Sequence, residues 1–203
     1  MASLARSTRA VARCDAARAA IFVCDIQERF KPLIHNSATI INRSAFMLET
    51  CKILDIPALA TLQYPKIFGQ MVPELKMEGI PCFEKSNFSM MTPEMAAAFE
   101  SLDKDVIIIV GIEAHVCIQQ TVLDLVDLGK EVHVICDAVS SQKSYDREIA
   151  LRKMENVGAH LTTAESCAFD LLRGSKHPKF KEVSSLIKEY NMGIEDEFSN
   201  GKM

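Results

Sequence analysis

Residues 105–125 read DVIIIVGIEAHVCIQQTVLDL, and this stretch decides the fold. The run 106–110 is apolar at every position and rich in β-branched side chains, which is typical of a strand buried on both faces. Helical periodicity begins directly afterwards, near His115, and Gly129 ends it. A doubly buried strand that leads at once into a helix predicts a parallel sheet covered by helices on both sides.

Strand-like and helix-like segments alternate along the rest of the chain. Strands are expected over residues 19–25, 56–63, 80–85, 105–111 and 131–137, and HLTTAES (160–166) leads into a short helix. One helix is expected to begin after Ser37, which serves as its N-cap, and another is expected over 92–102 with Thr92 as its N-cap. Further helices are expected over residues 115–128, 145–157 and 177–190. This order predicts one three-layer α/β/α domain with a Rossmann-like, doubly wound parallel sheet of about six strands.

The composition is that of an ordinary globular domain without a nucleic-acid-binding surface. The 203 residues are 48% hydrophobic, and the formal net charge is -4. Nucleic-acid binding needs clustered Lys and Arg, so we regard it as disfavoured. No uninterrupted apolar stretch approaches the ~20 residues that cross a bilayer, and the sequence predicts a soluble protein that does not span a membrane.

Seven cysteines occur without a recognisable pairing pattern. An odd count without CxxC or Cys/His spacing is typical of a reduced compartment and disfavours both a disulfide framework and a structural zinc site. Several lie inside apolar runs, where cysteine acts as a small hydrophobic residue. The seven are Cys14, Cys24, Cys51, Cys82, Cys117, Cys136 and Cys167.

The first 18 residues form an Arg-rich, Ser-containing N-terminal arm whose one acidic residue is Asp15. Such a composition is typical of a mitochondrial transit peptide. A cytoplasmic protein that keeps the arm is the alternative. Residues 191–203 are expected to form a flexible tail.

Three predicted strand ends carry residues capable of chemistry, namely Asp25, Lys85 and, after the fourth strand, Cys117. A helix N-terminus favours the thiolate form of cysteine, which is the nucleophile. Asp25 could accept the thiol proton, and Lys85 could orient Asp25. Each residue also has a structural interpretation: Asp25 as a capping residue, Lys85 as a surface lysine and Cys117 as a buried core residue. The residues alone leave both interpretations open.

Several segments together resemble the isochorismatase-like cysteine hydrolase family, closest to the eukaryotic isochorismatase domain-containing proteins. The resemblance covers residues 19–172, and we place the hydrolase domain at 19–190. The segments that carry it are FVCDIQERF (22–30), EKSNFSM (84–90), GIEAHVCIQQTVLDLVDLG (111–129) and VHVICDAVSS (132–141), with TLQYP (61–65) and HPKFKEVSSLIKE (177–189) as weaker matches.

The resemblance implies a catalytic triad of Asp25, Lys85 and Cys117. In related amidohydrolases the Asp deprotonates the Cys, which attacks an amide or carbamoyl carbon and forms a thioester. The family also has a non-proline cis peptide before the nucleophile, here between Ile112 and Glu113, and an oxyanion hole from the N–H groups of Glu113 and Cys117. It further implies a homo-oligomer.

The sequence departs from the nicotinamidases of this family at Gln63 and Tyr64, where those enzymes carry a metal-binding Asp-x-His. We therefore expect no metal and no cofactor. The substrate pocket is expected to include Gln27, Phe30, Tyr64 and Phe88, although the same residues could serve as loop anchors. The two histidines near the expected site, His115 and His133, are interpreted as structural.

The leading functional hypothesis is a metal-independent cysteine hydrolase that cleaves a C–N bond of a small amide, carbamoyl or imide. One alternative is a catalytically weak, partner-binding member of the family. The other is an organellar nucleic-acid-processing protein, prompted by the Arg-rich arm.

Overall fold

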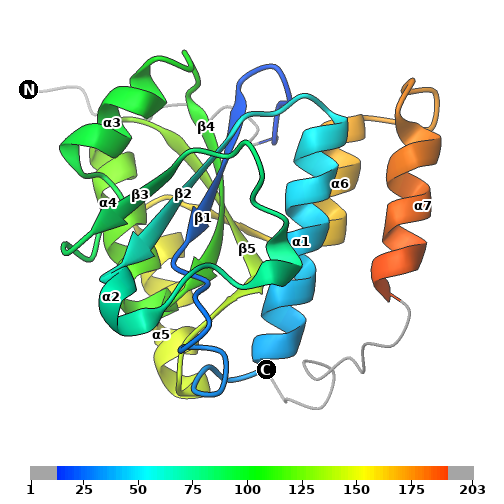
Figure 1. The fold of residues 1–203 in the computed structure, drawn as a ribbon. Helices are drawn as coiled ribbons and strands as arrows, with labels where there is room; N and C mark the ends of the chain where they lie inside the picture. Colours follow the sequence, from blue (N-terminus) through cyan, green and yellow to red (C-terminus); the bar gives the residue numbers. More distant parts are fainter. Residues whose placement is uncertain (1–12, 192–203) are drawn as a thin grey trace, which may run out of the picture.

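The computed structural model describes residues 13–191 and contains a six-stranded, all-parallel sheet (Figure 1). Its strand order is β3-β2-β1-β4-β5-β6. The predicted doubly wound α/β/α fold is therefore confirmed. The strands are β1 (Ala19–Cys24), β2 (Ala58–Gln63), β3 (Cys82–Lys85), β4 (Val106–Ile112), β5 (Glu131–Ser140) and β6 (His160–Thr162). Most of the predicted arm (1–12) and of the predicted tail (192–203) lies outside the described residues.

Helices cover both faces of the sheet, as the continuous apolar strands require. One face packs against α1 (Ser37–Ile53), α6 (Ala164–Leu172) and α7 (Phe180–Asn191), and the other packs against α3 (Pro93–Glu100), α4 (Gln119–Asp127) and α5 (Ser144–Asn156) (Figure 1). Alternate residues of β1 serve the two cores: Ile21 and Val23 face the first, and Phe22 faces the second. Both cores are largely aliphatic.

Three local features differ from the predicted helices. The segment expected as a helix from 115 begins as a π-helical turn, η2 (Ala114–Ile118), and α4 follows it. Ser37 is the first residue of α1 and not its cap, because Asn36 occupies the cap position in a left-handed conformation without a side-chain hydrogen bond. Two short helices between β2 and β3 were not predicted: α2 (Pro65–Phe68) and the 3-10 turn η1 (Pro73–Leu75).

The N-cap predicted for α3 is confirmed. Thr92 accepts a hydrogen bond from the backbone N–H of Met95 at 3.3 Å, and Pro93 is the first helical residue. Proline suits this position because the first helical N–H has no partner within the helix.

β1 and β4 lie side by side at the point where the strand order reverses. Gly111 of β4 is paired with Cys24 of β1. A Cβ atom at Gly111 would lie 2.2 Å from the Cys24 carbonyl oxygen, and its φ is +135°, so glycine is needed there. The carboxyl ends of these two strands form the crevice in which ligands bind in doubly wound sheets.

The last residues of the predicted arm lie against the domain. Cys14 is buried, and its N–H donates a hydrogen bond to the Asp170 carboxylate at 2.8 Å. Arg18 forms two hydrogen bonds with Asp105, at 2.9 and 2.7 Å. Within residues 13–191, no helix is both long enough and apolar enough to cross a bilayer.

Candidate active site

Asp25 follows the last residue of β1 and is almost completely buried. Its φ is +52°, and its N–H donates to the carbonyl of Thr61 on β2 at 3.2 Å. One carboxylate oxygen accepts from the Thr61 hydroxyl at 2.8 Å. The other lies 2.7 Å from the Lys85 ammonium and 3.5 Å from the Cys24 sulfur. A buried carboxylate needs such partners, because burial without them would neutralise it.

Lys85 ends β3, and its side chain is 0% exposed. Besides the ion pair with Asp25, its ammonium donates to the Gln63 side-chain oxygen at 2.6 Å and to the carbonyls of Phe88 and Asn87 at 2.9 and 3.2 Å. The charge is therefore surrounded by oxygen acceptors from the ends of β1 and β2 and from the loop that follows β3. The alternative interpretation of Lys85 as a surface lysine is therefore wrong, because its side chain is buried.

The pKa of Lys85 is set by opposing effects. Burial lowers it, but the neighbouring Cys24, Asp25 and Cys117 together raise the pKa above its ordinary value of 10.5. Burial raises the pKa of Cys24 well above 9.0, and the adjacent Cys117 and Asp25 raise it further. At neutral pH, Lys85 is consequently a cation and Cys24 a thiol.

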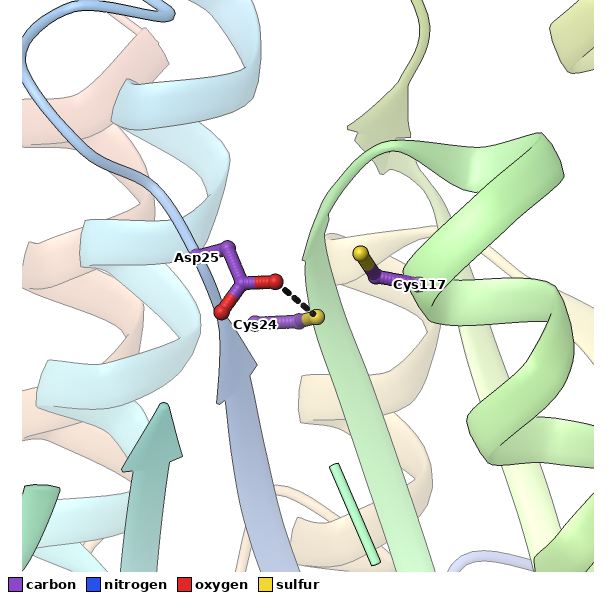
Figure 2. Close-up of side chains that lie close together, drawn as sticks. All are labelled: Cys24, Asp25 and Cys117. Atoms are coloured by element: carbon purple, nitrogen blue, oxygen red, sulfur yellow. Dashed lines mark hydrogen bonds between the residues drawn. The ribbon is translucent and has the colours of Figure 1, made fainter. Parts of the chain in front are cut away.

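Cys117 lies in the π-helical turn η2 and is 7% exposed. Its sulfur, the Cys24 sulfur and an Asp25 carboxylate oxygen all lie within 4.8 Å of one another. Figure 2 shows these three side chains directed into one space between the end of β1 and the turn that follows β4. The Thr121 hydroxyl donates to the Cys117 carbonyl at 2.7 Å and so fixes the turn. Single π-helical turns are frequent at functional sites.

The peptide bond between Ile112 and Glu113 is cis, at the position where the resemblance implied such a bond. The Glu113 carbonyl accepts the N–H groups of Val116 and Ile118, both at 3.1 Å. Its side chain accepts a hydrogen bond from Gln142 at 2.9 Å. Hydrogen bonds of both the Glu113 backbone and the Glu113 side chain therefore fix the segment between β4 and α4.

The four predicted pocket residues fall into two groups. Gln27 is buried, and its side-chain amide donates to the carbonyls of Gln63 and Gly69 at 3.0 and 2.8 Å, so it joins two loops. Phe30 stacks on Phe68, with ring centroids 4.5 Å apart.

The other two are exposed side chains at strand ends: Tyr64 is 49% and Phe88 52% exposed. Tyr64 follows β2, and its N–H donates to the Lys85 carbonyl at 3.0 Å. Phe88 is tied to Lys85 through its carbonyl. Both residues are thus linked through their backbone to Lys85, and their rings are free to contact a ligand.

The two histidines have local partners. The Nδ1 atom of His115 lies 2.9 Å from the Ser141 hydroxyl and 3.4 Å from a Glu113 carboxylate oxygen. His133 is buried, and its Nε2 atom lies 3.0 Å from Glu131. Neither contact involves Asp25 or Cys117.

Within the part of the chain that the structure describes, Cys24, Asp25 and Cys117 form the one group with metal-ligand spacing. The Lys85 ammonium, 2.7 Å from the Asp25 oxygen, opposes the binding of a second cation there. Gln63, at the position where nicotinamidases carry a metal ligand, uses its carboxamide to bind Lys85 and the Ser86 carbonyl. The residues therefore do not fit a metal centre.

Three neighbours of the site were not predicted as site residues: Cys24, Thr61 and Gln63. Cys24 and Thr61 read as ordinary strand residues. The contact of Thr61 with Asp25 depends on the pairing of β1 and β2, and the approach of Cys24 to Cys117 depends on the pairing of β1 and β4. Gln63 was noted as a departure from a metal site, but its contact with Lys85 depends on the pairing of β2 and β3.

Residues 19–166 match the sequence profile described as "Isochorismatase domain". The chain belongs to the isochorismatase-like hydrolase family. It is 41% identical to isochorismatase domain-containing protein 2 of Danio rerio over 168 residues, which cover 82% of this chain and 85% of the relative.

Solved structures of other proteins superpose on the chain. A Caenorhabditis elegans protein named MAR1 ribonuclease is 45% identical, with a TM-score of 0.84, over 87% of this chain and 93% of that one. The YcaC gene product of Escherichia coli, an octameric hydrolase of unknown specificity, is 23% identical, with a TM-score of 0.79, over 90% and 98% of the two chains. At that identity the YcaC likeness shows the fold alone.

Proposed function

We propose that this family member is a cysteine hydrolase that cleaves a C–N bond of a small amide, carbamoyl or imide substrate without a metal. The observation that carries the proposal is the buried Asp25–Lys85 ion pair within reach of the Cys117 thiol. Buried titratable groups that gather in the ligand-binding crevice of a fold are candidates for catalysis.

In the proposed reaction, Asp25 accepts the proton of the Cys117 thiol, and the thiolate attacks the carbonyl carbon of the substrate. The oxyanion is stabilised by the N–H groups of Glu113 and Cys117. The tetrahedral intermediate collapses as the leaving amine takes the proton from Asp25, which leaves a thioester on Cys117. Water, deprotonated by Asp25, then hydrolyses the thioester and releases the acid and the free thiol.

Lys85 has a positioning role in this proposal. Its ammonium fixes the Asp25 oxygen that faces the two thiols, and its positive charge stabilises the negative charge that moves between Asp25 and Cys117. Because four oxygen acceptors hold the ammonium, the charge needs little rearrangement during the reaction.

The substrate class is proposed from the residues at the neighbouring strand ends and from the chemistry of a thiolate. Tyr64 and Phe88, which carry exposed rings on backbone tied to Lys85, are proposed to pack against a small, flat substrate. Gln27 and Phe30 are proposed to hold the loops that shape this pocket. An amide, carbamoyl or imide is favoured because its carbonyl carbon is the electrophile that a thiolate attacks and its nitrogen can leave after protonation.

The test is ammonia release from a panel of small amides, carbamoyl compounds and imides. The wild-type protein is expected to turn over at least one of them, and Cys117→Ala is expected to lose about 10³-fold or more of that rate. Cys82→Ala, which removes an exposed thiol at the start of β3, is the matched control and should retain the rate. Equal release from wild type and Cys117→Ala would reject the proposal.

A second candidate is ribonuclease activity, because the Caenorhabditis elegans relative carries that name at 45% identity. The net charge of -4 disfavours it, since binding to a polyanion gains most of its affinity from Lys and Arg. RNA cleavage that is lost in Cys117→Ala would support it. A protein that cleaves neither RNA nor any amide would support the partner-binding alternative.

A further inference from the structure

Cys24 is a second buried thiol beside Cys117, and the proposed hydrolysis does not use it. Its sulfur donates to an Asp25 carboxylate oxygen at 3.5 Å and lies within 4.8 Å of the Cys117 sulfur. Figure 2 shows both sulfur atoms facing the space beside the Asp25 carboxylate. Two thiols with a carboxylate at this spacing supply a nucleophile and a base for disulfide formation, and oxidation of one thiol would supply the electrophilic sulfur.

The backbone holds the two thiols close. Cys24 is the last residue of β1 and is paired with Gly111, whose missing side chain lets the two strands approach. Cys117 lies in the turn that follows β4 directly, so its position relative to Cys24 depends on this close strand contact. Both side chains belong to the same hydrophobic core.

We propose that Cys24 is a resolving thiol, which forms a reversible disulfide with Cys117 after a hydroperoxide has oxidised Cys117. The bond would block the Cys117 sulfur and protect it from irreversible oxidation. Bond formation rests on the geometry of the two thiols alone, whereas the resulting loss of hydrolysis rests on the proposed function.

The steps balance in atoms and electrons. Asp25 takes the proton of the Cys117 thiol, and the thiolate attacks one oxygen of the hydroperoxide and becomes a sulfenic acid. The O–O bond breaks, and the leaving oxygen takes the proton back from Asp25 and departs as water, or as an alcohol if the peroxide is organic. Asp25 takes the proton of the Cys24 thiol, and the resulting thiolate attacks the Cys117 sulfur. The S–S bond forms as the S–OH bond breaks, and the hydroxide leaves as water with the proton from Asp25. Two thiols lose two electrons, which the hydroperoxide accepts.

The protonation of Cys24 and the exposure of Cys117 give the order of the steps. Burial and its neighbours keep the Cys24 pKa high, so this thiol keeps its proton until Asp25, its hydrogen-bond acceptor, removes it. Cys117 is the more accessible of the two residues, at 7% exposed against 0%. The oxidant therefore meets Cys117 first, and Cys24 acts second.

The test uses the full-length protein with hydrogen peroxide, followed by alkylation of free thiols and peptide mapping by mass spectrometry. In the wild type we expect a linked peptide that joins Cys24 to Cys117, two hydrogens lighter than the reduced pair and reversed by dithiothreitol. Cys82→Ser, which removes an exposed thiol, is the matched control and should give the same linked peptide.

In Cys24→Ser, Cys117 is expected to pass on to sulfinic and sulfonic acid, so that the thiol recovered by dithiothreitol falls about tenfold below the wild type. Irreversible oxidation of Cys117 to the same extent in wild type and Cys24→Ser, or a linked peptide that does not join these two cysteines, would overturn the proposal. The wild-type mapping decides the question even if Cys24→Ser folds poorly. A linked peptide in a protein that releases no ammonia would reject the proposed function and leave the disulfide standing.

Discussion

Asp25 and Lys85 form an ion pair that is shielded from solvent, because their side chains are 1% and 0% exposed. Such a pair adds little stability over a well-packed apolar pair, but loss of one partner leaves a buried charge uncompensated. The additional acceptors on Lys85 and the Thr61 hydroxyl on Asp25 show that the surroundings are built to keep both groups charged. The pair is therefore expected to be costly to break and to be sensitive to pH at the alkaline end.

Replacing Lys85 by Met is expected to lower the free energy of unfolding by roughly 3–5 kcal/mol at neutral pH. Because the pKa of Lys85 is raised in the folded state, its contribution is fully present below its ordinary pKa of 10.5 and is lost as the pH rises through the raised value. Urea unfolding of wild type and variant should therefore differ by a constant amount from about pH 7 to about pH 9, and by less above about pH 11.

The control is Lys76→Met, which removes an exposed lysine paired with Glu49 at 3.3 Å and should leave the unfolding midpoint nearly unchanged. A Lys85→Met variant as stable as the wild type, or a difference that shrinks below pH 9, would show that the pair does not behave as a buried ion pair.

The sequence predicted that Asp25, Lys85 and Cys117 lie at strand ends, because the end of an apolar run is visible in the residues themselves. It did not predict the contact of Thr61 with Asp25 or the approach of Cys24 to Cys117, since these depend on which strands are neighbours. Gln27 shows the same limit. It was expected either in the pocket or as a loop anchor, and its side chain joins two loops through carbonyls that are distant in sequence.

Among the elements, β4 decides how the site is assembled. It pairs with β1 from Val106 to Gly111, and its pairing with β5 is irregular between Ile109 and Gly111. Gly111 lies at this irregularity and contacts Cys24. The end of β4 is therefore the place where β1 and β4 approach closely, and the segment that contains Cys117 follows it directly. Irregular pairing of this kind often re-aims a strand near a functional site.

Gly111→Ala is expected to destabilise the protein by about 3 kcal/mol or more, because the new Cβ would overlap the Cys24 backbone and the φ of +135° is unfavourable for alanine. Gly129→Ala is the matched control. Its φ is also positive, at +73°, but nothing lies within 4 Å of the added Cβ, so a loss of about 1–2 kcal/mol is expected.

Thermal or urea unfolding measures both variants. Equal losses in Gly111→Ala and Gly129→Ala would mean that the close approach of β1 and β4 does not constrain Gly111.

Long, strongly patterned elements were predictable, and short, irregular ones were not. β4 was visible because every residue in its run is apolar. The π-helical turn η2 was not, because its residues fit an α-helix equally well and the extra residue is accommodated by packing against β5 and α5. The helix α2 was not predicted either. It has four residues and follows Tyr64, whose backbone is in the left-handed conformation.

At the scale of the whole molecule, the N-terminal segment has two parts that meet near Cys14. From Cys14 onward it contacts α6 and the start of β4, whereas the Arg-rich residues before it carry the composition of a transit peptide. We propose that the arm directs the protein to mitochondria, with a cytoplasmic location as the alternative, and that the domain assembles as a homo-oligomer.

A fusion of residues 1–20 to a fluorescent protein is expected to be imported into mitochondria. Replacing Arg6, Arg9 and Arg13 by Gln in the fusion is the control and should abolish import, because basic residues drive it. A purely cytosolic signal from the unmodified fusion would contradict the proposed location.

The most direct test of the central claim is acid quenching of the protein during turnover of an amide that releases ammonia, followed by peptide mapping by mass spectrometry. The proposed reaction predicts the acyl part of the substrate on the Cys117 sulfur as a thioester, and no acyl group at this position in Cys117→Ala. Ammonia release that continues at the wild-type rate in Cys117→Ala, with no acyl group on Cys117 of the wild type, would contradict it.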